Sequence, residues 1–415
     1  MPLTIHLDDF RPCYFGNETI RGRVLFESST VLETRDIRVT FSGISKAKIQ
    51  KVKGAGAPAA NYRSRCVLFE KEKIVLHLNG EALAPGSYEW PFEFIFPSAV
   101  QGSSKWAQGP PFHSDANHPL PPTFAIETGD ESRKVKCGIE YLLQAKVSKP
   151  QHGIIPSNAV LFLEELRLKF IPDCALSDGH DSGYSEIYRQ QKEQIFNIST
   201  MLLLPQNRGR TLSMQEKLQS WFFPSQLPRF SFTASFSYPT RVIQGSPLQC
   251  LLEITPHIES SSITSPPEIV MKSISIEATS QTAARASPSL IGAMSAEIND
   301  RVDILSKTGL HIPVTGTVNL GELFGLLVFK HADVSFSTFN ISRSYRLSVR
   351  IVFECAGTTS DLNFSNLLFD IVSDCKGPEK KDLAFETVES VGDAPPLYTD
   401  EPHSDISGAT IRDLS

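Results

Sequence analysis

The stretch from residue 83 to residue 97 has the clearest hydrophobic pattern in the chain. Pro85-Gly86 predicts a tight turn, because proline fixes φ and glycine tolerates positive φ. The aromatic residues that follow alternate with smaller or charged ones, so they share one face of a β-strand: Tyr88, Trp90, Phe92, Phe94 and Phe96. A face this apolar needs a cover of similar width, and long helical patterns are scarce nearby. The pattern therefore predicts two packed sheets, a β-sandwich.

The same two-residue alternation recurs in both halves of the chain. Residues 137–147 place five apolar side chains on one face: Ile139, Tyr141, Leu143, Ala145 and Val147. Tyr345–Cys355 has the same arrangement in the second half. Each half also opens alike, with a glycine-containing turn and a strand, at Phe15–Phe26 and Ile243–Leu252. Two units that open and close in the same manner predict a duplicated domain.

Residues 173–228 interrupt the strand pattern. Helical spacing predicts one helix there, on Tyr184, Tyr188, Gln191, Ile195 and Ile198. Ser213 and Glu216 form a capping-box pattern for a second helix, which carries Met214, Leu218, Trp221 and Phe222 and ends at Pro224. We expect both helices to pack against a sandwich, because apolar stripes usually mark core faces. Docking to a membrane or a partner is the alternative.

These patterns predict an all-β protein with four segments. We expect two tandem antiparallel β-sandwich domains of immunoglobulin-like type, at residues 1–172 and 229–375. A linker or insertion with short helices, residues 173–228, separates them. Residues 376–415 are acidic, rich in Ser, Pro and Gly and poor in large apolar side chains, which predicts a disordered tail.

The charge of the chain is concentrated in that tail. The whole chain has a net charge of −6, and the tail contributes −5 from nine Asp/Glu against four Lys/Arg, which leaves about −1 for the rest. A nearly neutral body does not favour nucleic acid as a partner, since that would require a concentrated basic surface.

Cysteine usage and hydropathy predict a cytoplasmic protein. The seven cysteines are scattered and include no C-x-x-C pair, which is typical of buried thiols in a reducing compartment. The first residues lack the pattern of a secretory signal, and apolar runs such as Leu326–Phe329 are too short to span a bilayer.

A group of lysines follows the second predicted strand, at Lys46, Lys48, Lys51 and Lys53. The simpler interpretation is a solvated hairpin. The alternative is contact with an acidic surface, such as a phosphorylated cargo protein or the inner leaflet of a membrane.

Catalytic patterns are incomplete. Gly179-His-Asp-Ser-Gly183 has the form of a serine-nucleophile loop, and His113 with His118 could suggest a metal pair. Neither comes with the further groups that such sites need at workable spacing. We expect no enzyme activity, no metal site and no cofactor.

Three motifs follow one another along the chain: Leu83-x-Pro-Gly-x-Tyr-x-x-Pro-Phe-x-Phe94, the step from Leu120-Pro-Pro-x-Phe124 into Gly138-Ile-x-Tyr141, and Ile341-x-Arg-x-Tyr-x-Leu-x-Val349. In this order they resemble the arrestin family, in particular the fungal arrestin-related trafficking adaptors, or α-arrestins. The resemblance implies two antiparallel sandwiches side by side and a scaffold without catalysis. The motifs do not locate the buried charged cluster or the phosphate-sensing lysines by which visual and β-arrestins detect phosphorylated receptors, so the resemblance is not extended to that mechanism.

The tail contains Pro395-Pro396-Leu397-Tyr398, a PPxY motif. Its prolines pre-set the polyproline II conformation, and Tyr398 adds a ring and a hydroxyl at a fixed offset, which WW domains recognise. In α-arrestins such motifs bind the WW domains of HECT-type ubiquitin ligases. Lys376, Lys380 and Lys381 lie near the motif and are candidate ubiquitin acceptors.

The sequence thus predicts an adaptor that links membrane transporters or receptors to a HECT-type ligase and promotes their ubiquitination and endocytosis. Its site of action would be the cytoplasmic side of the plasma membrane or of endosomes. The alternative is a cargo-sorting coat subunit or a signalling scaffold of the same fold that recruits no ligase.

Overall fold

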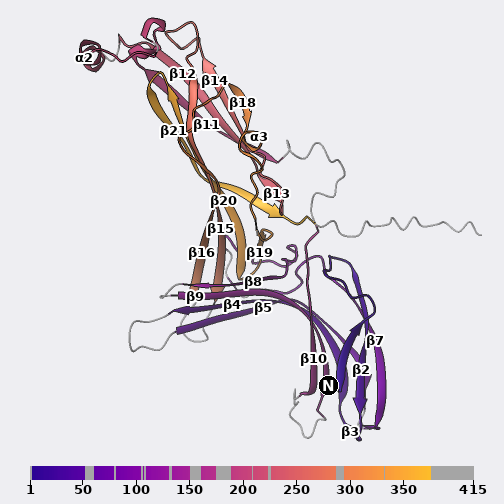
Figure 1. Ribbon diagram of the computed structural model, residues 1–415. Helices are drawn as coiled ribbons and strands as arrows, with labels where there is room; N and C mark the ends of the chain where they lie inside the picture. Colours follow the sequence, from indigo (N-terminus) through magenta and orange to yellow (C-terminus); the bar gives the residue numbers. More distant parts are fainter. Residues whose placement is uncertain are drawn as a thin grey trace, which may run out of the picture. The chain divides into compact units, whose positions relative to one another are not determined.

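Strands dominate the computed structural model (Figure 1). It describes residues 2–51, 60–78, 81–103, 106, 109–129, 133–149, 160–173, 188–207, 209–222, 226–286, 294–330 and 332–374. In these ranges the chain forms an all-β protein, and both halves belong to one unit, Met1–Gly377.

Two antiparallel sheets make up the first half. The smaller has the order β1-β2-β7, with bounds Leu3–Leu7, Thr19–Ser28 and Gly86–Ile95. The larger has the order β10-β9-β4-β5, with β8 also paired to β9; the bounds are Val160–Leu168, Arg133–Ser148, Asp36–Lys51, Ala60–His77 and Phe124–Gly129. A short pair, β3 (Leu32–Glu33) with β6 (Ala82–Leu83), lies outside both sheets.

The aromatic strand β7 has the facing that its alternation predicts. Phe92, Phe94 and Phe96 are buried, and Tyr88 and Trp90 pack half-buried against the same core. The ring of Phe96 contacts the ring of Phe41, on the opposite sheet, in an edge-to-face arrangement with 4.9 Å between the ring centres. It also stacks on Phe170, with 4.7 Å between the ring centres. The two sheets therefore close over this face as a sandwich.

The second half has the same plan. One sheet has the order β11-β12-β14-β18, with bounds Arg189–Ser199, Arg229–Pro239, Leu251–His257 and Gly316–Asn319. The other has the order β13-β21-β20-β15-β16, with bounds Arg241–Ile243, Thr358–Val372, Ile341–Cys355, Ile269–Ala286 and Met294–Lys307. β17 (Ile312–Pro313) pairs with β15, and β19 (Phe336–Ser337) pairs with β20. A short helix, α3 (Leu320–Phe324), follows β18.

Strand order repeats between the halves. The run β10-β9-β4-β5 matches β21-β20-β15-β16, so β9 and β20, which the sequence pairs as counterparts, hold the same position. A parallel bridge between Tyr14 and Phe170 matches the parallel pairing of β13 with β21. This repetition is what an internal duplication predicts.

One sequence prediction for the middle segment is wrong. Residues 189–199 form the strand β11, not a helix, and pair with β12 from Arg189–Pro239 to Ser199–Arg229 without a break. Phe196 and Ile198 face the core two residues apart, while Ile195, which fitted the helical spacing, is 64% exposed. β11 therefore belongs to a sheet of the second half, although residues 173–228 were assigned to a separate insertion. The division of the chain at 172, 228 and 375 otherwise stays a prediction.

The second predicted helix is present, but its apolar stripe is exposed. Two short 3-10 turns, η1 (Met201–Leu203) and η2 (Pro205–Asn207), lead to α2 (Met214–Phe222). Met214, Leu218 and Phe222 are 75%, 51% and 70% exposed, so the expected packing of this stripe against a sandwich is wrong.

The core of the first half includes side chains of the second. Five buried residues from the ends of the second half's strands and from the loop before β20 belong to the same cluster as Phe41 and Ile49: Ala284, Ala286, Ala296, Phe339 and Ile341. The far end of β4 is therefore covered on its inner face by the other sandwich.

Candidate functional site

A basic face forms on the outer side of β4, β5 and β9. Along β4, Ala47 and Ile49 point into the core, so Lys46 and Lys48 point away from it. Strand register brings further cations to the same face. Lys46 lies opposite Arg65 of β5, and Lys48 lies opposite both Arg63 of β5 and Lys136 of β9. We define the basic face by the six cations Lys46, Lys48, Arg63, Arg65, Lys134 and Lys136.

Two carboxylates share the basic face. Lys136 pairs with Glu127 of β8 at 2.7 Å, and Lys46 pairs with Glu140 at 2.8 Å. Six cations against these two carboxylates leave an excess of +4 among the described residues of the face. The pKa of Glu127 lies below its usual value because Lys136 donates a hydrogen bond to it, and the charges of Lys136, Lys48 and Lys134 add to the effect.

The centre of the basic face is a row of like charges. Arg63, Lys48 and Lys136 lie directly across from one another on three neighbouring strands. Like charges opposite each other in a sheet destabilise it, unlike the mixed pairs that sheets usually carry. An anion bound over this row would relieve the repulsion, so the row is suited to contact with an acidic surface.

The structure brings together only part of the predicted lysine group. Lys46 and Lys48 lie on the basic face, whereas Lys51 has the opposite parity along β4 and points to the other side. Lys53 lies outside the described residues. Lys134 and Lys136 were missed by sequence reasoning, although their alternation with the buried residues Val135 and Cys137 could have marked them as outward-facing.

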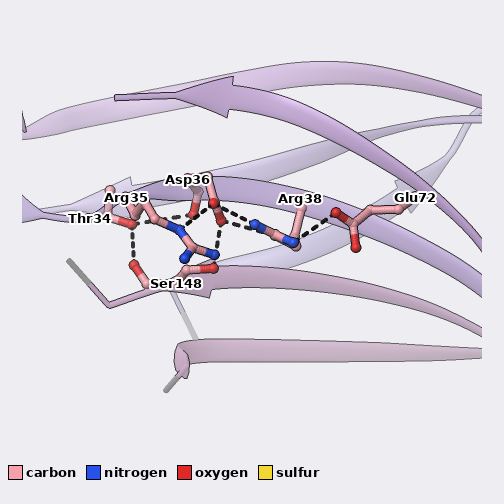
Figure 2. Close-up of polar contacts among 6 residues, drawn as sticks. All are labelled: Thr34, Arg35, Asp36, Arg38, Glu72 and Ser148. Carbon is pink, nitrogen blue, oxygen red and sulfur yellow. Dashed lines mark hydrogen bonds and ion pairs between the residues drawn. The ribbon is translucent and has the colours of Figure 1, made fainter. Parts of the chain in front are cut away.

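A buried carboxylate, Asp36, fixes the start of β4 (Figure 2). Arg38 binds both of its oxygens, at 3.0 and 2.5 Å, and Arg35 Nε donates to it at 2.8 Å. Ser148 Oγ at the end of β9 donates at 2.6 Å, and the Ser148 carbonyl in turn accepts from Thr34. Burial alone would raise the pKa of Asp36, but hydrogen bonds from Arg38, Ser148 and Arg35 outweigh it and hold the pKa far below its usual value.

Asp36 is suited to a structural role. It stays ionised at neutral pH, so it neither gives nor takes a proton there. Its oxygens already accept from two guanidinium groups and a hydroxyl, and Arg38 also pairs with Glu72 at 2.8 Å. The cluster therefore ties the start of β4 to the end of β9.

Polar contacts join the two halves. Asn340 Nδ2 donates to Ser64 Oγ at 2.8 Å, and its Oδ1 accepts from Ser45 Oγ at 2.5 Å. The Arg285 guanidinium lies 4.6 Å from the ring centre of Phe112 and 4.9 Å from that of Trp106, both in the first half. Buried polar groups that are fully paired in this way fix one arrangement of the surfaces that carry them.

His113 and His118 are brought together, as parallel rings 4.5 Å apart. His118 is buried; its Nδ1 contacts the Asp115 carbonyl at 2.8 Å and its Nε2 contacts Thr338 Oγ1 at 3.2 Å. Both ring nitrogens therefore have oxygen partners, and the pair acts as a contact to the second half. Within the described ranges, no three His, Cys, Asp or Glu side chains are grouped to hold a metal ion.

Several other predicted positions lie outside the described residues. They are the Gly179–Gly183 loop, Lys376, Lys380, Lys381 and the motif residues Pro395, Pro396 and Tyr398. Among the described cysteines, Cys137 and Cys250 are buried, and burial raises the pKa of each thiol to about 12, which keeps them unreactive. None of the described helices has the length and hydropathy of a membrane span.

We compared the sequence with models of known protein families. Residues 3–161 match the family described as arrestin (or S-antigen), N-terminal domain. This part of the chain is an arrestin N-terminal domain. The arrestin domain runs from β1 to the first residues of β10, and it contains both the basic face and the Asp36 cluster. A search of curated proteins found no match to the chain.

An arrestin N-terminal domain supports an adaptor or scaffold role in trafficking. Members of this family generally bind cargo and trafficking machinery and act without catalysis. The basic face and the joined sandwiches fit such a role, because they offer a charged surface on a rigid support.

Proposed function

We propose that this protein is an α-arrestin-type adaptor that links membrane cargo to a HECT-type ubiquitin ligase. The arrestin domain supports the adaptor part of the proposal. The PPxY motif at Pro395–Tyr398 supports the ligase part, because two prolines and a tyrosine at this spacing fit the aromatic groove of a WW domain.

The single observation that carries the cargo side is the like-charge row on the basic face. Arg63, Lys48 and Lys136 are held side by side by strand register, with fewer carboxylates nearby than cations. An acidic or phosphorylated segment of a transporter or receptor tail is the cargo element that would neutralise this row. Rigid strands hold the cations in place, so little ordering entropy is lost on binding.

The two contacts act together by tethering. The body holds cargo while the tail holds the ligase, which raises the effective concentration of the ligase near cargo lysines. Lys376, Lys380 and Lys381 lie within about twenty residues of the motif and are the nearest acceptors on the adaptor itself. Action on the plasma membrane or on endosomes follows from the proposed cargo.

Binding to isolated WW domains tests the ligase contact. The full chain is expected to bind them, and Tyr398→Ala should abolish binding, because the ring and hydroxyl that fill the groove are lost. Mass spectrometry for diglycyl remnants on Lys376, Lys380 and Lys381 then checks ubiquitination in cells with active ligase. If Tyr398→Ala leaves WW binding and cargo degradation unchanged, the protein is instead a sorting coat subunit or a signalling scaffold without ligase recruitment.

Binding of an acidic peptide tests the cargo contact. A phosphorylated, acidic peptide should bind the full chain with an affinity that falls as salt rises. The double variant Lys48→Glu/Lys136→Glu should lose at least about tenfold in affinity. Lys51→Glu is the matched control, because this lysine is on the same strand but points to the other side. Equal loss in both variants would contradict a role for the basic face.

A further inference from the structure

Strand β16 lies at one end of the larger sheet of the second half. That sheet has the order β13-β21-β20-β15-β16, so among the described strands β16 pairs with β15 on one side and with none on the other. Figure 1 shows β16 at the margin of its sheet, next to β15. An edge strand of this kind offers a row of unpaired backbone groups to another chain.

Backbone hydrogen bonds show which residues of β16 point to the free edge. The Arg285 N–H donates to the Asn340 carbonyl, so the odd-numbered residues of this part of β15 bond to β20 and the even-numbered ones bond to β16. Through the register with β15, the even-numbered residues of β16 point back to β15 until the register shifts after Asp303. The odd-numbered residues therefore turn their N–H and C=O groups to the free edge: Ser295, Glu297, Asn299, Arg301 and Asp303.

The side chains of these edge residues share the outer face of the sheet. Ala296 is buried, so its neighbours along the strand point outward, and all of the edge residues are exposed. Two of them carry opposite charges that are weakly engaged within the chain. Glu297 accepts from the neutral amide of Gln281 at 2.9 Å, and Arg301 lies 3.7 Å from Glu277 with a side chain that is 75% exposed. Both charges can therefore contact a second chain at this edge.

An edge strand of the first sandwich, β7, is protected in a way that β16 is not. The Asp8 N–H donates to the Arg21 carbonyl, so β2 turns its odd-numbered residues to β1 and its even-numbered residues to β7. The odd-numbered residues of β7 then face its free edge, and one of them is Pro91, which has no N–H to offer. β16 contains no proline, so each of its edge residues has an N–H available for pairing.

Charge selects one register in which two copies of β16 can pair edge to edge as antiparallel strands. A two-fold axis at Asn299 pairs all of the edge residues and places Glu297 of each copy opposite Arg301 of the other. Moving the axis by one residue in either direction leaves an edge residue unpaired and separates both pairs of opposite charges. The strand is therefore complementary to itself in the register that uses its whole free edge.

The inner face of the paired strands is mostly apolar in the same register. Val302, which is 40% exposed, comes opposite Ala296 of the other copy. Ile298 comes opposite Asp300, and this mixed pair limits the affinity. We therefore expect a dimer that forms and dissociates with protein concentration.

We propose that the protein forms a two-fold dimer through β16, in which the larger sheet of the second half continues from one copy into the other. The occupant of the edge is a second copy, because the strand itself supplies the opposite charges where pairing requires them. The dimer would carry two arrestin domains and two PPxY motifs, so partners with repeated binding sites would be held at both. Its formation does not depend on cargo or ligase.

Analytical ultracentrifugation of the full chain over a concentration series tests this inference. The wild type should show a monomer–dimer equilibrium that salt shifts toward the monomer. Glu297→Arg and Arg301→Glu should each raise the dissociation constant of the dimer by about tenfold or more, because two pairs of opposite charges become two pairs of like charges. Glu193→Arg is the matched control, since Glu193 is an exposed glutamate on β11, the edge strand of the other sheet of this sandwich. It should dimerise as the wild type does.

A mixture of the two single variants gives the decisive result. One chain with Glu297→Arg and one with Arg301→Glu have opposite charges across the interface again, so the mixture should dimerise about as tightly as the wild type although each variant alone does not. This rescue also shows that both variants are folded. The inference is overturned if the wild type is monomeric at every concentration, if the mixture stays monomeric, or if Glu193→Arg loses dimerisation to the same extent.

Discussion

The guanidinium of Arg285 lies over the ring of Phe112, 4.6 Å from its centre, and so links the end of strand β15 to a loop of the arrestin domain. The same side chain donates to the Phe339 carbonyl at 2.6 Å and lies over Trp106. One arginine thus combines two cation–π contacts with a buried hydrogen bond where the two halves meet.

Replacement of Arg285 should weaken the junction between the halves. We expect Arg285→Ala to lower the free energy of unfolding by about 2–4 kcal/mol, from the lost ring contacts and an unpaired carbonyl. Arg285→Lys should recover part of this, because the charge remains but the planar stacking does not. Urea denaturation of the three proteins measures the difference, and wild-type stability in the alanine variant would show that the contact contributes nothing.

Asp36 should make the free energy of unfolding depend on pH in the acidic range. Its pKa is depressed in the folded state, so its contribution is fully present above the usual carboxyl value of 3.8 and is lost as pH falls below it. Asp36→Asn should cost about 3 kcal/mol at neutral pH, since two half-buried arginines lose their partner. The variant should also show a shallower loss of stability below about pH 4.

Denaturation curves over an acid series check the role of Asp36. Asp303→Asn, at an exposed carboxylate of β16, serves as the control and should follow the wild type. An acid dependence that is the same in Asp36→Asn as in the wild type would assign the effect to other carboxylates.

The protonation of His118 should affect the stability of the protein at higher pH than the protonation of Asp36 does. Burial lowers its pKa, so the unfolded chain takes up a proton before the folded one does, and stability falls as pH drops below about 6.5. A proton on His118 would place a buried positive charge beside the ring of His113, 4.5 Å away. We expect His118→Gln to remove this part of the pH dependence between about pH 7 and 5, as measured by thermal unfolding; an unchanged profile would contradict it.

The basic face should show a conflict between stability and binding. Lys48→Glu places an acid between Arg63 and Lys136, so we expect the free energy of unfolding to rise by about 0.5–1 kcal/mol. The same change should weaken binding of an acidic peptide. Chemical denaturation in low salt measures the stability, and the gain should shrink as salt is added. A destabilised Lys48→Glu would mean that the row is not repulsive.

Alternation predicted the strands where one face is buried. In β7 the aromatic residues recur every second position, and no other regular structure accounts for that spacing. In β11 the sequence was ambiguous, because exposed Ile195 fits a helix with Gln191 while buried Phe196 and Ile198 fit a strand. The sheet decided the outcome, since β11 completes its hydrogen bonds with β12.

The candidate site could be predicted only in part. Alternation places Lys46 and Lys48 on one face of their strand, but Lys136 joins them through the pairing of β4 with β9, about ninety residues further along the chain. Nothing near Arg285 or Asn340 in the sequence indicates that their partners are Phe112 and Ser64. Contacts over such distances depend on register and on how the halves meet, which local patterns do not encode.

The buried residues that the second half contributes to the first core have a consequence for biosynthesis. Because Phe339 and Ile341 are made long after the arrestin domain, a growing chain carries an incomplete first core until they leave the ribosome. During that interval apolar surface around Phe41 and Ile49 is open to water or to a chaperone. Premature termination before these residues would therefore leave a fragment with exposed apolar surface, which is prone to aggregate even though its own sequence is unchanged.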